Sequence, residues 1–266
     1  MKQERQKYMT VSAVKSRRFF TVFIIGTLAL LITVWFSVFC RVKTVTVENN
    51  EKISDTVILS QLNIMPYRHI YSFSEKKMEA DLLALSPYIK SARMERNLPS
   101  ELVIVLEEYA ADYYIIENDR CYLISDTLFV LEEIPLTEIG WHDAAYLALP
   151  EIKEDKYYSL SVGTTIRFTD KTDDAYIASL LQNVAESPFA SRLTSLTLDE
   201  KANITADIEG KYHLKFGNAK EFEKKLSLCA ASIDYLSENM VGVKGTLHAW
   251  TTENITFEIT GVAENP

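Results

Sequence analysis

The chain has 266 residues, 47% of them hydrophobic and 24% charged, and its formal net charge at pH 7 is −9. The charge is uneven, because residues 1–18 carry a net +5 and residues 19–266 carry −14. An acidic body with a short basic head argues against nucleic acid as the main partner, and the length suits one large or two small globular domains.

An uncharged segment follows the basic head. Residues 19–40 form a run of 22 residues without a charge. A helix of this length spans roughly 33 Å, which is enough to cross the hydrocarbon core of a membrane. Because Arg17 and Arg18 precede the segment, the positive-inside rule predicts a cytoplasmic head and an extracytoplasmic body, which is the type II topology.

A cleaved signal peptide is the alternative explanation of this segment. Its apolar region would be unusually long, since about 7–15 residues are usual, and no A-x-A-like cleavage site follows. Cys40 could mark a lipoprotein, but the residue before it is Phe39, where a small residue is expected. We therefore expect an uncleaved single-pass anchor, with the membrane as one partner.

The stretch after the anchor predicts a strand and then two helices. Valine alternates with threonine in VKTVTVENN, residues 42–50, with the period of a half-buried strand. Ser54 or Asp55 is expected to cap the first helix. Ser72 and Glu75 have capping-box spacing at the head of the second helix.

A predicted hairpin completes this domain, which we place at residues 42–110. Pro87 is expected to end the second helix. Residues 88–97 and 101–108 are strand-like and flank a turn that contains Pro99. The expected order β-α-α-β-β is long enough for a small independent domain.

Residues 111–262 predict a second, mixed α+β unit with an antiparallel sheet, followed by a short tail at 263–266. The expected elements, in chain order, are strands at 112–118, 121–125, 128–133 and 145–149, a helix at 172–186, two or three strands within 195–218, a helix at 220–239, and a hairpin of residues 245–250 and 255–260.

No active-site motif is recognisable in the sequence. The eight glycines form no dinucleotide-binding, phosphate-binding or nucleophile-elbow motif, and the four histidines lack ligand spacing. Trp141-His142-Asp143 is the most enzyme-like triplet, but a solvated histidine in a polar loop is commoner than a ligand. Consecutive strand residues such as Glu107 and Glu108 point to opposite faces and cannot grip one substrate atom together. We expect no enzyme activity, cofactor, metal or small-molecule substrate.

The three cysteines, Cys40, Cys121 and Cys229, are sparse and include no C-x-x-C motif. Their number and spacing exclude a disulfide scaffold and a zinc ribbon. Cys121 and Cys229 are expected to be small buried thiols, although the sequence leaves open a bond between them.

The order of basic head, apolar helix and β-α-α-β-β module resembles the bacterial cell-division family FtsQ/DivIB, whose membrane-proximal module is a POTRA domain. The matching residues lie in VKTVTVENNEKIS and LSPYIKSARMERNLPSELVIVLEEYAADYYI, and they are Pro87, Ala92, Met94, Arg96, Pro99, Leu102, Ile104 and Glu107 or Glu108. Arg96 and the glutamates are expected to form a solvated or salt-bridged rim of the hairpin.

A weaker resemblance extends to the family's β-domain, where a strand ends at a glycine before a helix with a Lys-Leu pair. Gly217, Lys225 and Leu226 stand at these positions. The sequence departs from the family at Asp126-Thr127, where a glycine often follows the aspartate.

The resemblance implies a non-enzymatic scaffold of the divisome, located at the division septum. It also implies binding of FtsL-like and FtsB/DivIC-like coiled-coil proteins and a part in regulating septal peptidoglycan synthesis. A membrane-anchored extracytoplasmic enzyme and a POTRA-bearing translocation or secretion component are the alternatives.

The family's partner site lies on the last strand of the β-domain. Carried onto this chain, it comprises Trp250, Ile255, Thr256, Phe257, Glu258 and Ile259. An exposed edge strand offers N–H and C=O groups to which a partner strand can add. The alternative is that these residues only complete the sheet.

Overall fold

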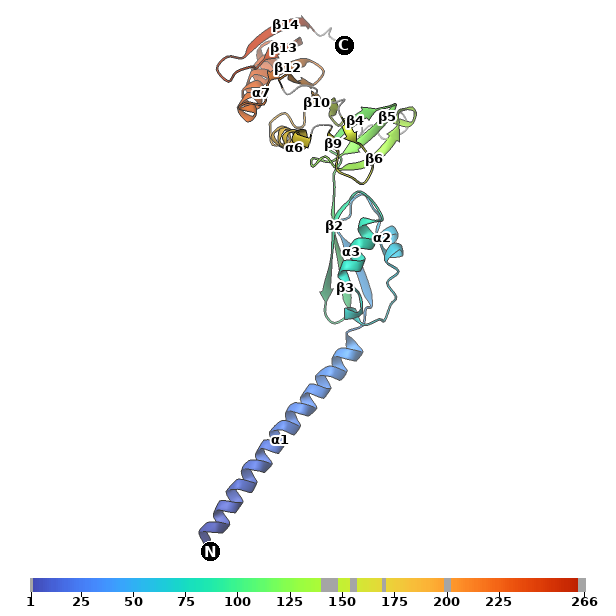
Figure 1. Cartoon of the computed structure of the whole chain (residues 1–266), viewed down its shortest axis with the longest axis vertical. Coiled ribbons are helices and arrows are strands. Elements are labelled where there is room, and N and C mark those ends of the chain that lie inside the picture. Colours follow the sequence, from blue (N-terminus) through green and yellow to red (C-terminus); the bar gives the residue numbers. More distant parts are fainter. Residues whose placement is uncertain (1, 140–147, 154–156, 169–170, 199–201, 263–266) are drawn as a thin grey trace. The chain divides into compact units, whose positions relative to one another are not determined.

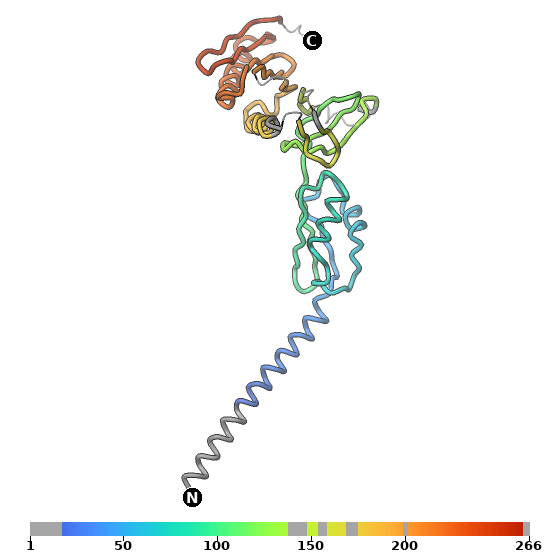
Figure 2. The backbone as a smooth tube through the Cα atoms, viewed as in Figure 1, coloured from blue at the N-terminus to red at the C-terminus, as the bar shows by residue number. Residues whose placement is uncertain are grey.

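The computed structural model describes residues 2–139, 148–153, 157–168, 171–198 and 202–262 (Figure 1). The chain forms two compact units. The first comprises Met1–Leu85 and Ile89–Glu108, and the second comprises Ser86–Tyr88 and Tyr109–Pro266. The trace in Figure 2 follows the chain from one unit into the other.

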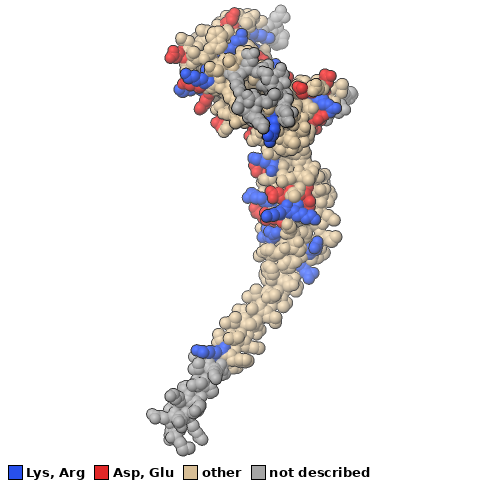
Figure 3. Space-filling view, in the orientation of Figure 1, with Lys and Arg blue, Asp and Glu red and all other residues tan. Residues whose placement is uncertain are grey.

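Helix α1 (Lys2–Phe39) begins the first unit. Its Arg18–Phe39 segment is the one helical segment, among the described residues, that is long and apolar enough to cross a membrane, and none of it is buried. Figure 3 shows the helix as a surface without charged residues beyond the arginine at the start of this segment. The expected apolar helix is therefore present, with the length and composition that an anchor requires.

The rest of the first unit confirms the predicted order β-α-α-β-β. Its elements are β1 (Thr44–Glu48), α2 (Asp55–Leu62), the 3₁₀ helix η1 (Ile70–Ser72), α3 (Glu75–Leu83), β2 (Ile89–Asn97) and β3 (Glu101–Glu108). The sheet has the order β1-β3-β2, in which β3 is parallel to β1 and antiparallel to β2. Ile58, Met78 and Leu82 from the helices are buried in the same core as the sheet residues Leu102 and Ile104.

One predicted helix cap is wrong. Ser72 belongs to η1, and the residue that caps α3 is Ser74, whose hydroxyl accepts a hydrogen bond from the Lys77 amide at 3.4 Å. The 3₁₀ turn uses residues that the capping-box pattern assigned to the helix start. Helix α3 also ends at Leu83, before it reaches Pro87.

The second unit is built on a nine-stranded sheet of order β14-β13-β12-β11-β10-β7-β4-β5-β6, with β8 and β9 paired separately. Its elements are β4 (Tyr113–Glu117), β5 (Arg120–Ile124), β6 (Val130–Pro135), α4 (Leu136–Ile139), β7 (Glu151–Lys153), β8 (Tyr157–Ser159), β9 (Arg167–Phe168), α6 (Lys171–Ala185), β10 (Leu193–Thr197), β11 (Ile204–Ile208), β12 (Tyr212–Gly217), α7 (Phe222–Asn239), β13 (Val243–His248) and β14 (Thr256–Val262). The predicted mixed α+β class is confirmed.

Helices α6 and α7 bury their apolar faces in the main core of this unit. Leu181 of α6 and Ile233 of α7 are fully buried there together with Leu196, Leu214 and Leu247 of the sheet. Both helices were expected from their apolar spacing. The strand expected at 145–149 falls largely outside the described residues, whereas α4, β7, β8 and β9 were not expected.

All three cysteines are buried free thiols, which confirms the prediction for Cys121 and Cys229. Cys229 lies in the main core of the second unit, whereas Cys121 lies in a small separate cluster with Leu123 and Ile134. Burial raises the pKa of Cys121 to about 11 and that of Cys229 to about 12. Neither thiol is therefore ionised at neutral pH, which makes both unreactive.

Candidate functional site

Strand β14 forms one edge of the nine-stranded sheet. It pairs antiparallel with β13, and no other described strand pairs with it. The N–H and C=O groups along its outer side are therefore available to an added strand. Thr256, Phe257, Glu258 and Ile259, four of the six residues expected at a partner site, lie in this strand.

The two other predicted residues lie outside β14. Ile255 directly precedes the strand and packs against the main core. Trp250 lies in the β13–β14 loop, where 63% of it is exposed and its ring is 5.0 Å from the ring of His248. The structure therefore groups four of the expected residues on the edge and places Trp250 beside it.

Gly245 of β13 allows β14 to approach β13 closely. A Cβ atom at this position would come within 2.4 Å of the Glu258 carbonyl oxygen and 2.5 Å of the Phe257 ring. The ring of Phe257 thus extends across the glycine toward Tyr212, with 6.4 Å between the ring centroids. This contact holds the edge strand on the sheet.

The edge strand carries exposed apolar side chains. Ile259 is 54% exposed and Val262 is 69% exposed. Proteins usually protect a sheet edge with charges, bulges or a covering segment, because an apolar edge pairs readily with another chain. The β13–β14 pair has a bulge between Lys244 and Gly245, and Glu258 is exposed in the strand. The edge is therefore only partly protected against strand addition.

Lys225 of α7 fixes the end of β12, close to this edge. Its ammonium group donates hydrogen bonds to the carbonyl oxygens of Phe216 at 2.8 Å and Asn218 at 2.9 Å, and the residue is only 2% exposed. Burial lowers the pKa of Lys225. Gly217 adopts φ +67° between these two carbonyls, and a Cβ there would lie 3.4 Å from Trp250. The glycine and lysine of the weaker resemblance therefore build one turn.

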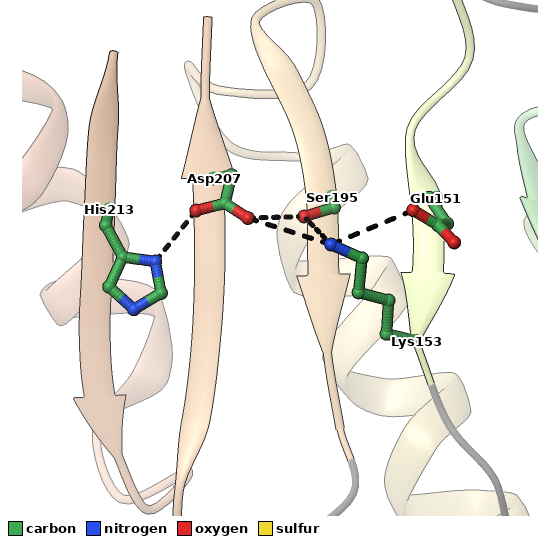
Figure 4. A network of polar contacts seen from close by, with 5 residues as sticks. All are labelled: Glu151, Lys153, Ser195, Asp207 and His213. Atoms are coloured by element: carbon green, nitrogen blue, oxygen red, sulfur yellow. Dashed lines mark hydrogen bonds and ion pairs between the residues drawn. The ribbon is translucent and has the colours of Figure 1, made fainter. Parts of the chain in front are cut away.

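A polar network crosses neighbouring strands of the same sheet (Figure 4). The Ser195 hydroxyl of β10 donates to Asp207 Oδ2 of β11 at 2.7 Å and accepts from Lys153 Nζ of β7 at 3.2 Å. Asp207 Oδ1 lies 2.7 Å from Nδ1 of His213 on β12. Glu151 completes the network, 3.8 Å from Lys153 Nζ. These residues line a hollow of about 330 Å³.

The order of the contacts argues against nucleophilic catalysis. In a catalytic triad the histidine lies between the serine and the acid and takes the serine proton. Here Asp207 lies in the middle, so Ser195 donates to a carboxylate and has no contact with His213. The network is therefore a set of satisfied cross-strand bonds, of the kind that stabilises a sheet.

Asp207 contributes to the free energy of unfolding, and this contribution depends on pH. Burial raises its pKa, but the hydrogen bonds from His213 and Ser195 outweigh burial, so the pKa lies below the ordinary 3.8. Stability from a carboxyl with a lowered pKa is present above the unfolded value and is lost as the pH falls through the folded value.

We expect Asp207→Asn to lower the unfolding free energy at neutral pH by about 1 kcal/mol or less, because solvent screens a partly exposed group. The side chain is 37% exposed. The difference from the parent should shrink as the pH falls below 3.8, the ordinary value for this group. Denaturant unfolding of both proteins across this range tests the claim, and a difference that does not change with pH contradicts it.

The adjacent glutamates of the first unit have separate partners, as the pleat of a strand predicts. Glu107 accepts hydrogen bonds from Lys90 and Ser91, and these bonds, led by that of Lys90, lower its pKa. Glu108 Oε2 accepts from the backbone amides of Glu51 at 3.0 Å and Lys52 at 2.7 Å. The pair is therefore not a joint acid site.

The interactions of Arg96 differ from the prediction, in which its side chain is solvated or salt-bridged. Its guanidinium donates to the carbonyl oxygens of Ile70 at 3.4 Å and Phe73 at 3.1 Å, and it lies 5.5 Å from the centre of the Tyr71 ring. Arg96 thus ties the loop before α3 to the hairpin. A sequence pattern cannot reveal main-chain acceptors, so the prediction favoured a carboxylate or water.

Replacing Arg96 with methionine should destabilise the first unit by about 1–2 kcal/mol, because two carbonyl groups lose a charged donor. Arg93→Met is the matched control on the same strand, where the side chain is exposed, and it should change stability by at most about 0.5 kcal/mol. Denaturant unfolding measures both changes, and equal effects would refute the role of Arg96.

The remaining signature residues serve the fold. Ala92 is buried in the core of the first unit, Pro87 is half-buried before β2, and Pro99 is exposed in the hairpin turn after a cis peptide bond. The triplet Trp141-His142-Asp143 lies outside the described residues. Within the described ranges, no three His, Cys, Asp or Glu side chains gather as metal ligands would.

Sequence reasoning missed the network of Figure 4. The available signal was the alternation of polar with apolar residues around Asp207 and His213, whereas Ser195 is followed by a second buried residue, Leu196. That alternation indicates one exposed face for each strand. It does not reveal which strands are neighbours, so it could not bring these three residues together.

Comparison with known proteins gives two matches. A family model described as "POTRA domain, FtsQ-type" matches residues 40–109. The cell division protein DivIB of Clostridium tetani (strain Massachusetts / E88) is 30% identical over 107 residues, which are 40% of this chain and 40% of that protein. The match thus spans less than half the length of the relative. Together, the domain and the relative confirm the resemblance to the FtsQ/DivIB family that the sequence indicated, and this resemblance includes an FtsQ-type POTRA domain at residues 40–109.

Proposed function

We propose that this chain is a non-enzymatic, membrane-anchored component of the bacterial cell-division machinery. Its N-terminus would lie in the cytoplasm, and its two folded units would act outside the membrane at the division septum. The order of an apolar helix followed by an FtsQ-type POTRA domain supports this role. The match to a protein named for cell division also supports it. The proposed scaffold requires no cofactor and no small-molecule substrate.

The proposed partners are FtsL-like and FtsB/DivIC-like single-pass proteins, through which the chain would help regulate septal peptidoglycan synthesis. The observation that carries this proposal is the open edge of β14, because an extended partner segment can add to it as a further strand. Main-chain hydrogen bonds would supply affinity, and the exposed Ile259 and Val262 would add apolar contacts.

Ile259→Lys tests the edge without opening the core, since 54% of Ile259 is exposed. Recovery of small membrane partners on the tagged full-length chain should fall roughly tenfold, equivalent to about 1.4 kcal/mol of binding free energy. Ile116→Lys is the matched control, because Ile116 is 42% exposed on β4, in the same sheet but remote from β14 in strand order. The control should retain its partners.

Two results would contradict the proposal. One is a diffuse membrane signal of the tagged chain in dividing cells, without a band at midcell. The other is equal partner recovery by the Ile259→Lys variant and the parent, when circular dichroism shows that both are folded. The first result rejects the division role, and the second rejects the edge as the binding surface.

A further inference from the structure

The end of the first unit that adjoins α1 is tied to the helix by main-chain hydrogen bonds. The Ile70 amide donates to the Cys40 carbonyl at 2.9 Å, directly after the last helical residue. Val42 exchanges bonds with the loop before η1, donating to Arg68 at 2.9 Å and accepting from Tyr67 at 2.8 Å. This loop is therefore held at the end of the helix.

The hairpin turn between β2 and β3 lies at the same end. The Lys43 amide donates to the Ser100 carbonyl at 2.8 Å. Three segments thus surround the end of α1, namely the residues just after it, the loop before η1 and the hairpin turn. The exposed side chains of these segments, together with that of Tyr71 in η1, are here called the collar, which consists of Arg41, Lys43, Tyr67, Arg68, Tyr71 and Leu98.

The collar exposes aromatic and apolar side chains. Tyr67 is 67% exposed, Tyr71 is 53% exposed and Leu98 is 52% exposed. The ring of Phe36, in the last turns of α1, lies 5.5 Å from the ring of Tyr71. Tyrosine has an apolar body and a polar tip, and it is enriched where a protein meets the boundary between lipid and water.

The collar is also basic. Arg41, Lys43 and Arg68 are exposed, whereas residues 40–43, 63–72 and 97–101 contain one carboxylate, Glu101. Arg96 is engaged with main-chain carbonyls and is not counted as a collar cation. Exposed cations beside a membrane-spanning helix attract anionic lipid headgroups.

We propose that the collar lies in the headgroup layer of the same bilayer that α1 crosses and binds anionic phospholipid there. The inference rests on the membrane anchoring in the proposed function. Two observations favour this occupant, namely the main-chain connection of the collar to the end of α1 and its combination of aromatic and basic side chains. The POTRA domain would then have a second contact with the membrane, which fixes its tilt.

The test places a fluorophore on the full-length chain at Tyr67→Cys, which is feasible because the native cysteines are buried. The matched site is Glu51→Cys, whose backbone is bound to Glu108 at the other end of β3. The two ends of this strand lie roughly 23 Å apart. The protein is reconstituted in phosphatidylcholine vesicles with and without phosphatidylglycerol, and a quencher is attached to the lipid headgroups.

We expect the label at position 67 to be quenched several-fold more than the label at position 51, and more so with phosphatidylglycerol. Equal quenching of the two labels in protein that floats with the vesicles overturns the proposal. Flotation itself reports anchoring by α1, so protein that fails to float rejects the anchoring, and with it the collar.

A charge variant tests the lipid preference. Combining Arg41→Gln, Lys43→Gln and Arg68→Gln should remove the additional quenching that phosphatidylglycerol causes at position 67. The control variant combines Lys52→Gln, Lys90→Gln and Arg93→Gln and loses the same charge. It should retain the additional quenching at position 67. Additional quenching that survives the collar variant overturns the assigned role of these cations.

Discussion

Replacement of Lys225 with methionine is expected to destabilise the second unit by about 2–4 kcal/mol, because a charged donor is removed from the buried carbonyl group of Phe216 and the partly buried one of Asn218. The side chains are of similar length, so the apolar packing changes little. The ammonium group bonds to Phe216 and Asn218 on both sides of Gly217, so the turn that ends β12 should loosen. Denaturant unfolding measures the loss.

Lys224→Met is the matched control in the adjacent position of α7. Lys224 is 70% exposed and pairs with Glu221 at 2.8 Å, a surface contact that contributes at most about 1 kcal/mol. If both variants lose the same small amount of stability, the bonds made by Lys225 do not hold the turn. Hydrogen exchange around residues 216–218 provides a second measurement, and it should rise in the Lys225 variant alone.

Gly245→Ala is expected to displace β14 from β13. The added Cβ would lie 2.4 Å from a main-chain oxygen and 2.5 Å from an aromatic ring, so either the strand or Phe257 must move. Overpacking of this kind typically costs about 1–3 kcal/mol. We expect faster hydrogen exchange at residues 243–248 and 256–262 and, if the proposed function is correct, a loss of partner recovery without unfolding of the unit.

The same substitution, glycine to alanine, at Gly261 is the control. Gly261 also lies in the β13–β14 pair, but a Cβ atom there has no neighbour within 4 Å. Gly261→Ala should therefore leave hydrogen exchange and partner recovery close to those of the parent. Similar hydrogen-exchange rates in the two variants would show that the close approach of β14 to Gly245 does not determine how firmly the edge strand is held.

Local periodicity predicted the longer helices and most strands. The apolar faces of α6 and α7 were visible because residues three and four apart share one side of a helix. The POTRA hairpin was visible because Pro99 separates two strand-like runs. Each of these features depends on residues that are close in the sequence, so no knowledge of the tertiary fold was needed.

Pairings between distant strands could not be predicted in this way. Strand β10 is parallel to β7 and antiparallel to β11, and β12 is parallel to β13. The contacts among Ser195, Asp207 and His213 follow from these pairings, as does the position of β14 at the edge. Arg96 illustrates the same limit, because the carbonyl groups that it binds belong to a loop more than 20 residues earlier in the chain.

The parallel pairing of β1 with β3 has a mechanical consequence. Strand β1 follows α1 and its flanking loop, and β3 ends where the chain passes into the second unit. A pulling force between the anchor and the second unit therefore acts on the beginning of β1 and the end of β3, along the strands. Because the two strands are parallel, this force loads their hydrogen bonds in shear, so that the bonds share the load rather than opening one by one. The POTRA domain is thus connected as a tension-bearing link.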